Sequence, residues 1–236
     1  FAQEDSIAIP RAERAPNLDD YISGVPADAG VAVTGFRQNA PGDGDAVSLE
    51  TRVYLSYDSE HLYAVFVCKD DPKLMRARIV RRDNIFGDEG VQLFLDTFDD
   101  NQRAFAFGAN PYGAQLDSKV TEGQGYDFNF DTQWVSDGRI VDDGYVVLME
   151  IPLKSLRFNP TETQRWGIAM QRIIPRLNEV SYWPYITQRK EGFIPQFGTA
   201  TIDEKIAPGR NIQVIPHVTY RDTRLLEPDG NGGARI

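Results

Sequence analysis

The chain has 236 residues, of which 41% are hydrophobic and 11% aromatic, which is enough for a sizeable core and argues against disorder. This length exceeds that of a modal domain but fits one large β domain, since sandwiches and barrels often reach this size. The formal net charge of −10 argues against nucleic acid as a partner, because phosphate binding needs a basic surface. No run approaches the roughly 18 consecutive apolar residues of a membrane-spanning helix.

The first 30 residues contain prolines and many small and acidic residues, and they predict an N-terminal leader over 1–30 that packs on the domain. Asn17 is a candidate N-cap for a short helical turn within it. The start, Phe1-Ala2-Gln3, resembles the end of a signal peptide with a small residue at its cleavage site. This favours a bacterial protein that is secreted, periplasmic or outer-membrane-associated.

Short strands are predicted from residue 31 onward. Ser48 to Asp58 alternates between apolar and polar residues, whereas Leu62 to Lys69 is continuously apolar, as expected of a central strand buried on both faces. Many such segments follow at regular spacing, with almost no helical periodicity. The sequence therefore predicts an all-β fold, an antiparallel β-sandwich of the jelly-roll type, over 31–206.

The character of the chain changes at residue 207. Pro208-Gly209-Arg210 is typical of a linker, and Asn211 to Arg221 alternates as one long strand. Because this strand has no further strand to pair with, residues 207–236 are predicted to be a linker and the start of a truncated following domain.

Most tryptophans and the single cysteine are predicted to be core residues. Trp134 and Trp166 lie within strand patterns, and Cys68 ends an apolar run, which favours a buried thiol over a nucleophile. One cysteine also excludes an intramolecular disulfide. Trp183, beside Pro184 at a strand end, is the tryptophan expected at the rim of a binding site.

The segment from Arg81 to Asp96 joins a polar loop to a structured strand. The loop contains Phe86 and a Gly-Asp-Glu turn, and the strand alternates, with Val91 and Leu93 on one face and Gln92 on the other. Functional residues often lie on loops held by a rigid scaffold. A binding site is therefore expected here first.

Several short phrases occur in an order typical of one family. They are Val53–Asp58 with Leu62-Tyr63, Arg81–Asp83, Val91–Asp96, Phe105–Pro111 with Gly113, Asp131–Trp134, Gly144-Tyr145 with Glu150–Pro152 and Leu156, Trp166-Gly167 with Arg172, and Phe197-Gly198. Together they resemble the family 9 carbohydrate-binding module, a β-sandwich. More narrowly, they resemble the version at the N-terminus of bacterial exported proteins that continue into an outer-membrane-like β-barrel. The resemblance covers roughly 16–202 and implies that the strand from Asn211 begins that barrel.

The resemblance implies a sugar site. In the family two tryptophans sandwich a terminal sugar, since aromatic rings stack on the apolar faces of sugars. Phe86 and Phe193 fall at or near these positions, so neither tryptophan is present. Gln92 and Gln171 match polar groups that contact the sugar, which suits amides because they both donate and accept. A family arginine falls at Gly108.

Three charged residues are candidate replacements for the missing arginine: Arg82, Asp83 and Arg172. In the alternative interpretation, they form a buried or half-buried ion-pair network that holds the loop, since Arg and Asp are rarely buried unless paired. The two interpretations are compatible with each other.

Metal binding rests on the acidic turn that contains Asp96, Asp99 and Asp100. Their carboxylates suit calcium, but the spacing is not that of an EF-hand, and such runs usually form a solvated turn. Because the family often carries structural ions, the resemblance implies a structural calcium. No other cofactor is expected.

Catalysis is the competing class of function. Glycoside hydrolysis needs two carboxylates about 5–10 Å apart. Asp83 with Asp88, or Asp117 with Asp127, are conceivable pairs, although no motif selects them. No Ser or Cys motif accompanies either histidine, so a catalytic triad is unsupported.

The sequence therefore predicts a non-catalytic carbohydrate-binding domain in a system that degrades or takes up polysaccharide. Its expected partners are an oligo- or polysaccharide and a downstream β-barrel of the same polypeptide. The main alternative is a protein-interaction or plug domain that serves the barrel and binds no sugar, which the absence of both tryptophans favours. A glycoside hydrolase, accessory or catalytic, is the second alternative.

Overall fold

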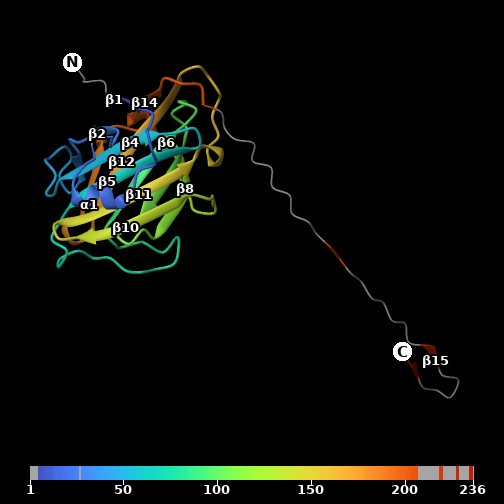
Figure 1. Ribbon diagram of the computed structural model, residues 1–236. Helices are drawn as coiled ribbons and strands as arrows, with labels where there is room; N and C mark the ends of the chain where they lie inside the picture. The colour runs from blue at the N-terminus through green and yellow to red at the C-terminus, as the bar shows by residue number, and fades with distance from the viewer. Residues whose placement is uncertain (1–4, 27, 207–217, 220–226, 229–233, 236) are drawn as a thin grey trace.

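The computed structural model describes residues 5–26, 28–206, 218–219, 227–228 and 234–235. Two β-sheets pack face to face and dominate the described chain (Figure 1), which confirms the predicted all-β sandwich. Within these residues no helix is long and apolar enough to cross a membrane. The strand predicted from Asn211 to Arg221 lies outside the described residues, apart from 218–219.

Sheet A has nine strands in the order β1-β14-β12-β6-β7-β8-β9, with β13 paired to β12 and β3 paired to β13. Their bounds are β1 Ser6–Ala8, β3 Arg37–Ala40, β6 Gly90–Asp96, β7 Arg103–Ala109, β8 Gln115–Thr121, β9 Gly125–Asp127, β12 Gln164–Ile174, β13 Glu179–Trp183 and β14 Gly198–Ile202. All ladders in this sheet are antiparallel except the parallel pair of β1 with β14.

Sheet B is antiparallel and has five strands in the order β10-β11-β5-β4-β2. Their bounds are β2 Val31–Val33, β4 Thr51–Tyr57, β5 His61–Lys69, β10 Val135–Val141 and β11 Gly144–Pro152. The remaining elements are helix α1 Leu18–Ser23, the 3-10 turns Leu153–Ser155, Pro175–Leu177 and Ile194–Gln196, and the strand pair β15 Glu227–Pro228 with β16 Ala234–Arg235.

The main core lies between the two sheets and explains why β5 is apolar throughout. Leu62 and Phe66 point into this core, whereas Val65 points to the outer face of sheet B. Helix α1 covers that outer face with Leu18 and Tyr21, so both faces of β5 are buried, as predicted. Trp134, Trp166 and Cys68 are buried in the main core, which confirms their predicted positions.

Helix α1 begins at the predicted cap. The side chain of Asn17 accepts a hydrogen bond from the backbone N–H of Asp19 at 3.0 Å, which satisfies one of the free amides of the first turn. Only Leu18 and Tyr21 of this helix are buried. Its stability therefore comes from packing on sheet B, since six residues are too few for a helix that stands alone.

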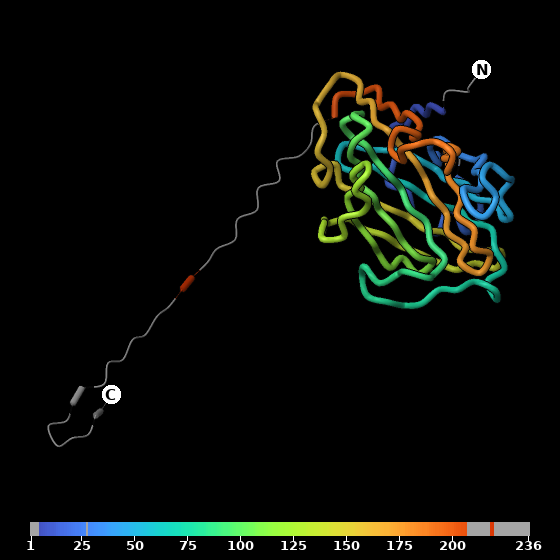
Figure 2. The backbone as a smooth tube through the Cα atoms, turned by 180° about the vertical axis from the view of Figure 1, so that it is seen from behind, coloured from blue at the N-terminus to red at the C-terminus, as the bar shows by residue number. Residues whose placement is uncertain are grey.

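The outer face of sheet A has a different cover. Phe94 of β6, Ala169 of β12 and Tyr182 of β13 form a second apolar cluster there, and the segment that contains Ile186 and Phe193 packs over it. The chain between β5 and β6 forms turns and loop rather than a helix, and Figure 2 shows this teal segment running along one end of the sandwich. This loop leads directly into β6 and the candidate site.

Candidate functional site

A pocket of about 220 Å³ lies at the end of sheet A where β6 begins, and we call it the Phe86 pocket. Its lining comes from the loop before β6, from β6 itself, from β8 and from the end of β12: Ile85, Phe86, Gly87, Asp88, Gly90, Val91, Gln92, Leu116, Ile173 and Pro175. The volume is below the roughly 300–1,000 Å³ of most ligand sites. It therefore suits a single ring or the end of a chain rather than a long ligand.

The loop that presents Phe86 is held from beneath. Asp88 is buried and pairs with Arg78, its Oδ1 lying 2.7 Å from Arg78 Nε, and its Oδ2 accepts from Asn110 Nδ2 at 3.2 Å. Arg78 also donates to the carbonyl of Phe86 at 3.0 Å. Gly87, at φ +82°, makes the turn in a conformation that side chains disfavour. The backbone is thus fixed while the Phe86 ring remains 59% exposed.

A row of polar side chains crosses the outer face of sheet A beside this pocket. Gln92 lies directly opposite Gln171 on β12 and Gly108 on β7, and Gln171 lies opposite Tyr182 on β13. The register places Gln92 and Gln171 on one face of sheet A. Gly108 leaves room for Gln92, since a Cβ there would lie 3.1 Å from Gln92 Cγ.

The two glutamines differ in their partners. Gln171 Nε2 donates to the Tyr182 hydroxyl, whereas its buried Oε1 has no hydrogen-bond partner within the described structure. Gln92 is half-buried and lines the pocket. An unpaired buried acceptor costs free energy, so a hydroxyl donor that reached this oxygen would stabilise the site.

Exposed aromatic rings continue from Phe86 across sheet A. Phe128 meets Phe86 edge-on, with ring centroids 5.5 Å apart, and stacks on Tyr126 at 5.6 Å with only 5° between their planes. Phe128 and Tyr126 are 46% and 42% exposed. Tyr126 in turn contacts Phe94, and Phe94 contacts Phe193 at 5.2 Å. We call Phe86, Phe128 and Tyr126 the aromatic platform.

Phe193 does not face Phe86. Three rings, those of Phe128, Tyr126 and Phe94, lie between them in the chain of contacts, and Phe193 packs on the buried Phe94. The predicted pair of stacking rings is therefore not brought together. Phe128 is the aromatic neighbour of Phe86, from a loop 42 positions further along the chain.

Trp183 lies on the opposite face from the predicted rim. It pairs with Met170, a core residue, and packs half-buried against the main core. Successive residues of a strand point to opposite faces, so Tyr182 beside it takes the outer position.

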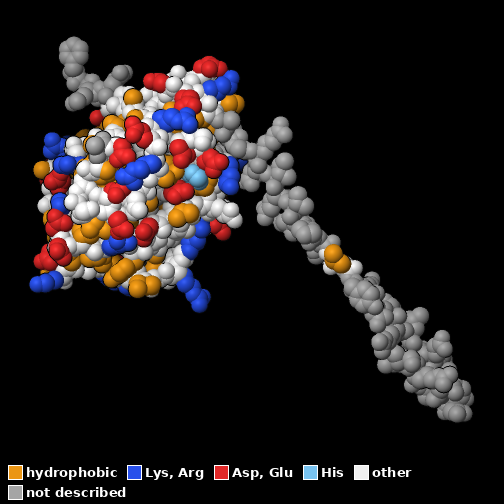
Figure 3. Space-filling view, viewed as in Figure 1, with side chains coloured by type: hydrophobic (Ala, Val, Ile, Leu, Met, Phe, Trp, Pro, Cys, Tyr) orange, Lys and Arg blue, Asp and Glu red, His pale blue; other side chains and the backbone are white. Residues whose placement is uncertain are grey.

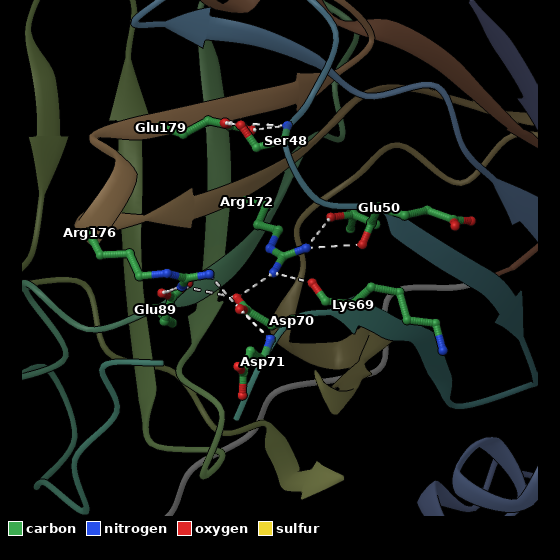
Figure 4. A network of polar contacts seen from close by, with 10 residues as sticks. Ser48, Glu50, Lys69, Asp70, Asp71, Glu89, Arg172, Arg176 and Glu179 are labelled. Carbon is green, nitrogen blue, oxygen red and sulfur yellow. Dashed lines mark hydrogen bonds and ion pairs between the residues drawn. The ribbon is translucent and has the colours of Figure 1, made fainter. Parts of the chain in front are cut away.

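Arg172 is fully buried between the sheets and out of reach of a ligand (Figure 4). It donates to the carbonyl oxygens of Glu50 and Lys69, at 3.0 and 2.9 Å, and to Asp70 Oδ2 at 3.1 Å. These bonds tie β12 of sheet A to β4 and β5 of sheet B. Of the two roles expected for Arg172, the structure therefore shows that of a buried ion-pair partner rather than that of a ligand contact.

Figure 4 also shows that the same network reaches the loop before β6. Arg176 bridges Asp70 and Glu89, and both of these carboxylates are buried. Burial and the neighbouring charge of Asp70 raise the pKa of Glu89 from 4.5 to about 7, against the opposing effect of the two arginines. Glu89 is thus a carboxyl that titrates near neutral pH inside the sandwich.

Arg82 holds the first half of the loop to sheet A. It pairs with the buried Asp117 and with Asp131, and donates to the carbonyl of Thr132 at 2.6 Å and to Gln115 at 3.1 Å. Asp83 beside it is half-exposed and has a positive φ of 65°. Neither residue lines the Phe86 pocket.

The carboxylates suggested for catalysis and for calcium are engaged elsewhere. Asp88 pairs with Arg78 and Asp117 with Arg82, while Asp83 lies 4.0 Å from Arg82 and Asp127 accepts the amide of Asn129. Asp96 is buried and accepts from two backbone amides, Asp99 pairs with Arg165, and Asp100 accepts the amide of Gln102. The described residues contain no cluster of three or more side chains that could hold a metal.

The aromatic platform is the part of the site that sequence reasoning missed. Its second and third members, Phe128 and Tyr126, come from the Gly-rich aromatic segment 122–129, which forms β9 and the turns before and after it. The Gly-rich, aromatic composition of that segment is the feature of the sequence that could have indicated these two residues. Its position beside Phe86 depends on the β8–β9 ladder, which no local pattern reveals.

No family model and no curated protein matches the chain in sequence. Among solved structures, it resembles a candidate carbohydrate-binding protein from Bacteroides uniformis ATCC 8492, with a TM-score of 0.61 and 15% identity over 84% of this chain and 98% of that one. It also resembles a family 9 carbohydrate-binding module from Caldicellulosiruptor kristjanssonii in complex with cellotriose, with a TM-score of 0.53 and 15% identity over 89% and 100%. The chain therefore has the β-sandwich fold of these modules.

Proposed function

We propose that this chain is a carbohydrate-binding domain whose site is the Phe86 pocket with the aromatic platform beside it. The observation that carries the proposal is the exposed ring of Phe86, fixed by Arg78 and Asp88 at the mouth of a pocket lined by Gln92. Two solved structures of the same fold are described as carbohydrate-binding, which supports the same class of ligand.

The chemistry of the platform fits a sugar. Phe86 and Phe128 present apolar surfaces on which a pyranose ring can stack, and stacking needs no charge. Gln92, in the lining of the pocket, supplies both a donor and an acceptor for hydroxyl groups. The small volume favours recognition of a terminal sugar.

The broader setting is also part of the proposal. We propose that the domain is exported, that it is non-catalytic, and that it serves a polysaccharide-degrading or uptake system with a downstream β-barrel of the same polypeptide. The engagement of Asp88 and Asp117 with arginines supports a non-catalytic role. An assay with aryl glycosides should accordingly show no turnover.

Isothermal titration calorimetry with glucose and with xylo-, cello- and malto-oligosaccharides tests the site. Phe86→Ala should weaken affinity about tenfold, because an aromatic contact contributes roughly 0.5–1.5 kcal/mol beyond the area that it buries. Tyr185→Ala is the matched control, since Tyr185 is 39% exposed, follows β13 and does not line the Phe86 pocket. Equal losses in both variants would contradict the assignment.

A protein-interaction domain is the second candidate, because three contiguous exposed rings also suit a protein surface. This role predicts no heat of binding with any of these oligosaccharides. It also predicts that Phe86→Ala weakens association with the rest of the same polypeptide. Saturable sugar binding that depends on Phe86 would exclude this candidate as the role of the platform.

A further inference from the structure

A second pocket, of about 190 Å³, lies toward the opposite end of β6 and β8, where β7 begins. Its lining includes Thr97 and Phe98 after β6, Arg103 and Phe105 at the start of β7, and Lys119 near the end of β8. We call it the Lys119 pocket. Five residue steps separate Gln92 from Thr97, which places it on the order of 15 Å from the Phe86 pocket, since a strand rises about 3.3 Å per residue.

Every charged side chain in this lining is cationic: Arg103, Lys119 and Arg157. The chain as a whole has a net charge of −10, and acidic and basic side chains are interspersed over the face shown in Figure 3. A concave site lined by one sign of charge raises the local concentration of the opposite ion. The pocket is thus a positively charged site on an acidic protein, and it favours a small anion as ligand.

Lys119 is positioned rather than free in solvent. Its Nζ lies 4.5 Å from the ring centroid of Phe130 and 5.9 Å from that of Phe105, which are favourable cation–π distances. Asp127 lies opposite Lys119 on β9, but its Oδ1 accepts from Asn129, and within the described structure neither Lys119 nor Arg157 makes an ion pair. Their charges are therefore available to a ligand.

The acidic turn beside the pocket offsets its positive charge only in part. Asp99 pairs with Arg165 at 2.9 Å, and Asp100 Oδ1 accepts the amide of Gln102 at 2.8 Å. Among the described residues, one ion pair reaches the pocket, between Arg103 and Asp100 at 3.5 Å; it is partly exposed and therefore contributes little.

The pocket also has an apolar component. Phe98 is 43% exposed, and Phe105 and Ala104 lie beside it in the lining. A ligand that fits carries a negative group for Lys119 and Arg157 and an apolar ring face for Phe98. Acidic sugars have both features.

We propose that the Lys119 pocket binds the anionic group of an acidic sugar, namely the carboxylate of a hexuronic acid or the sulfate of a sulfated sugar. The two share one chemistry, a compact oxyanion on a pyranose ring. The oxyanion site is inferred from the charges and aromatic rings of the pocket alone. The identification of the ligand as a sugar rests on the proposed function.

The test is calorimetric titration of the whole chain with glucuronate, glucose 6-sulfate, glucose and the methyl ester of glucuronate. Glucuronate or glucose 6-sulfate should bind, and whichever binds more tightly identifies the source of the oxyanion. Lys119→Gln should weaken this binding at least tenfold, whereas Lys73→Gln, at an exposed lysine in the loop after β5, should leave it unchanged. Added salt should weaken it further, and at this pocket the neutral ester should not bind.

Three results would overturn the proposal. They are equal affinity of the wild type and Lys119→Gln for both acidic sugars, no binding of either acidic sugar, and binding of acetate or inorganic sulfate as tight as that of the acidic sugars. Phe86→Ala separates this site from the proposed sugar site, because it should leave acidic-sugar binding intact. A wild type that binds an acidic sugar but no neutral sugar would contradict only the proposed Phe86 site.

Discussion

Phe86 and Glu89 lie three residues apart in one loop and have opposite environments. The ring of Phe86 is 59% exposed above a pocket, whereas the carboxyl of Glu89 is fully buried against Arg176. Between them Asp88 fixes the backbone through Arg78. One short segment thus both anchors the sandwich and presents the exposed ring of the proposed binding site, so the two roles can be separated by mutation.

The largest effect is expected at the buried end of this comparison. Arg172→Leu removes the cation that joins β12 to β4 and β5 and leaves Asp70 buried with one partner fewer. Breaking a buried ion pair costs about 3–5 kcal/mol of unfolding free energy. Urea unfolding measures this loss, with the exposed Arg189→Leu as control. A loss below about 1 kcal/mol would mean that the network is dispensable.

The second effect depends on pH. Because the pKa of Glu89 rises from 4.5 to about 7 on folding, the folded chain holds an extra proton between these values. This difference in pKa adds about 3 kcal/mol to the unfolding free energy. The added stability is present in full below pH 4.5 and is lost as the pH rises through 7. Glu89→Gln should remove this part of the decline when unfolding free energies at pH 5 and pH 8 are compared.

Glu162→Gln, at a carboxyl exposed on the surface, is the control for that experiment. Its decline in stability between the two pH values should match that of the wild type. An unchanged decline in Glu89→Gln would show that Glu89 is not the group that titrates.

A smaller loss of unfolding free energy is expected at Asp88, which lies between Phe86 and Glu89 in the loop. Asp88→Ala leaves Arg78 and Asn110 without their buried acceptor, which costs about 1–3 kcal/mol. Asp137→Ala, at an exposed position, should change little. Thermal unfolding measures both variants, and equal melting temperatures for wild type and Asp88→Ala would contradict the anchoring role.

The smallest effect on stability is expected at the exposed end. Phe128→Ala removes a ring that is 46% exposed, so unfolding free energy should fall by less than about 1 kcal/mol. Affinity for a neutral oligosaccharide should nevertheless fall, as for Phe86→Ala. A large loss of stability with unchanged affinity would make Phe128 a packing residue rather than a binding residue.

The sandwich could be predicted because its signals are local. Alternation along β6 and the apolar run of β5 specify strands and their faces, and Asn17 specifies the start of α1. The exposed loop position of Phe86 is local too. By contrast, the approach of Phe128 to Phe86 depends on the ladder between β8 and β9.

Some errors could have been avoided with the same local rules. Gln171 and Arg172 are neighbours in a strand, so they point to opposite faces and cannot both line one site. Trp183 follows Tyr182 in the same way. The depth of Arg172 could not be predicted, because it depends on Lys69 and Asp70, about a hundred residues away in the chain.

The parallel pairing of β1 with β14 has a mechanical consequence. Ile9 donates to the carbonyl of Thr201 at 2.9 Å, and Thr199 donates to that of Asp5 at 2.8 Å, so the first and last strands of the sandwich hold each other directly. Tension applied ahead of β1 and beyond β14 would pull these parallel strands in opposite directions and load their bonds together in shear, instead of opening them one at a time. The β1–β14 ladder is therefore the part of the sandwich that bears tension first.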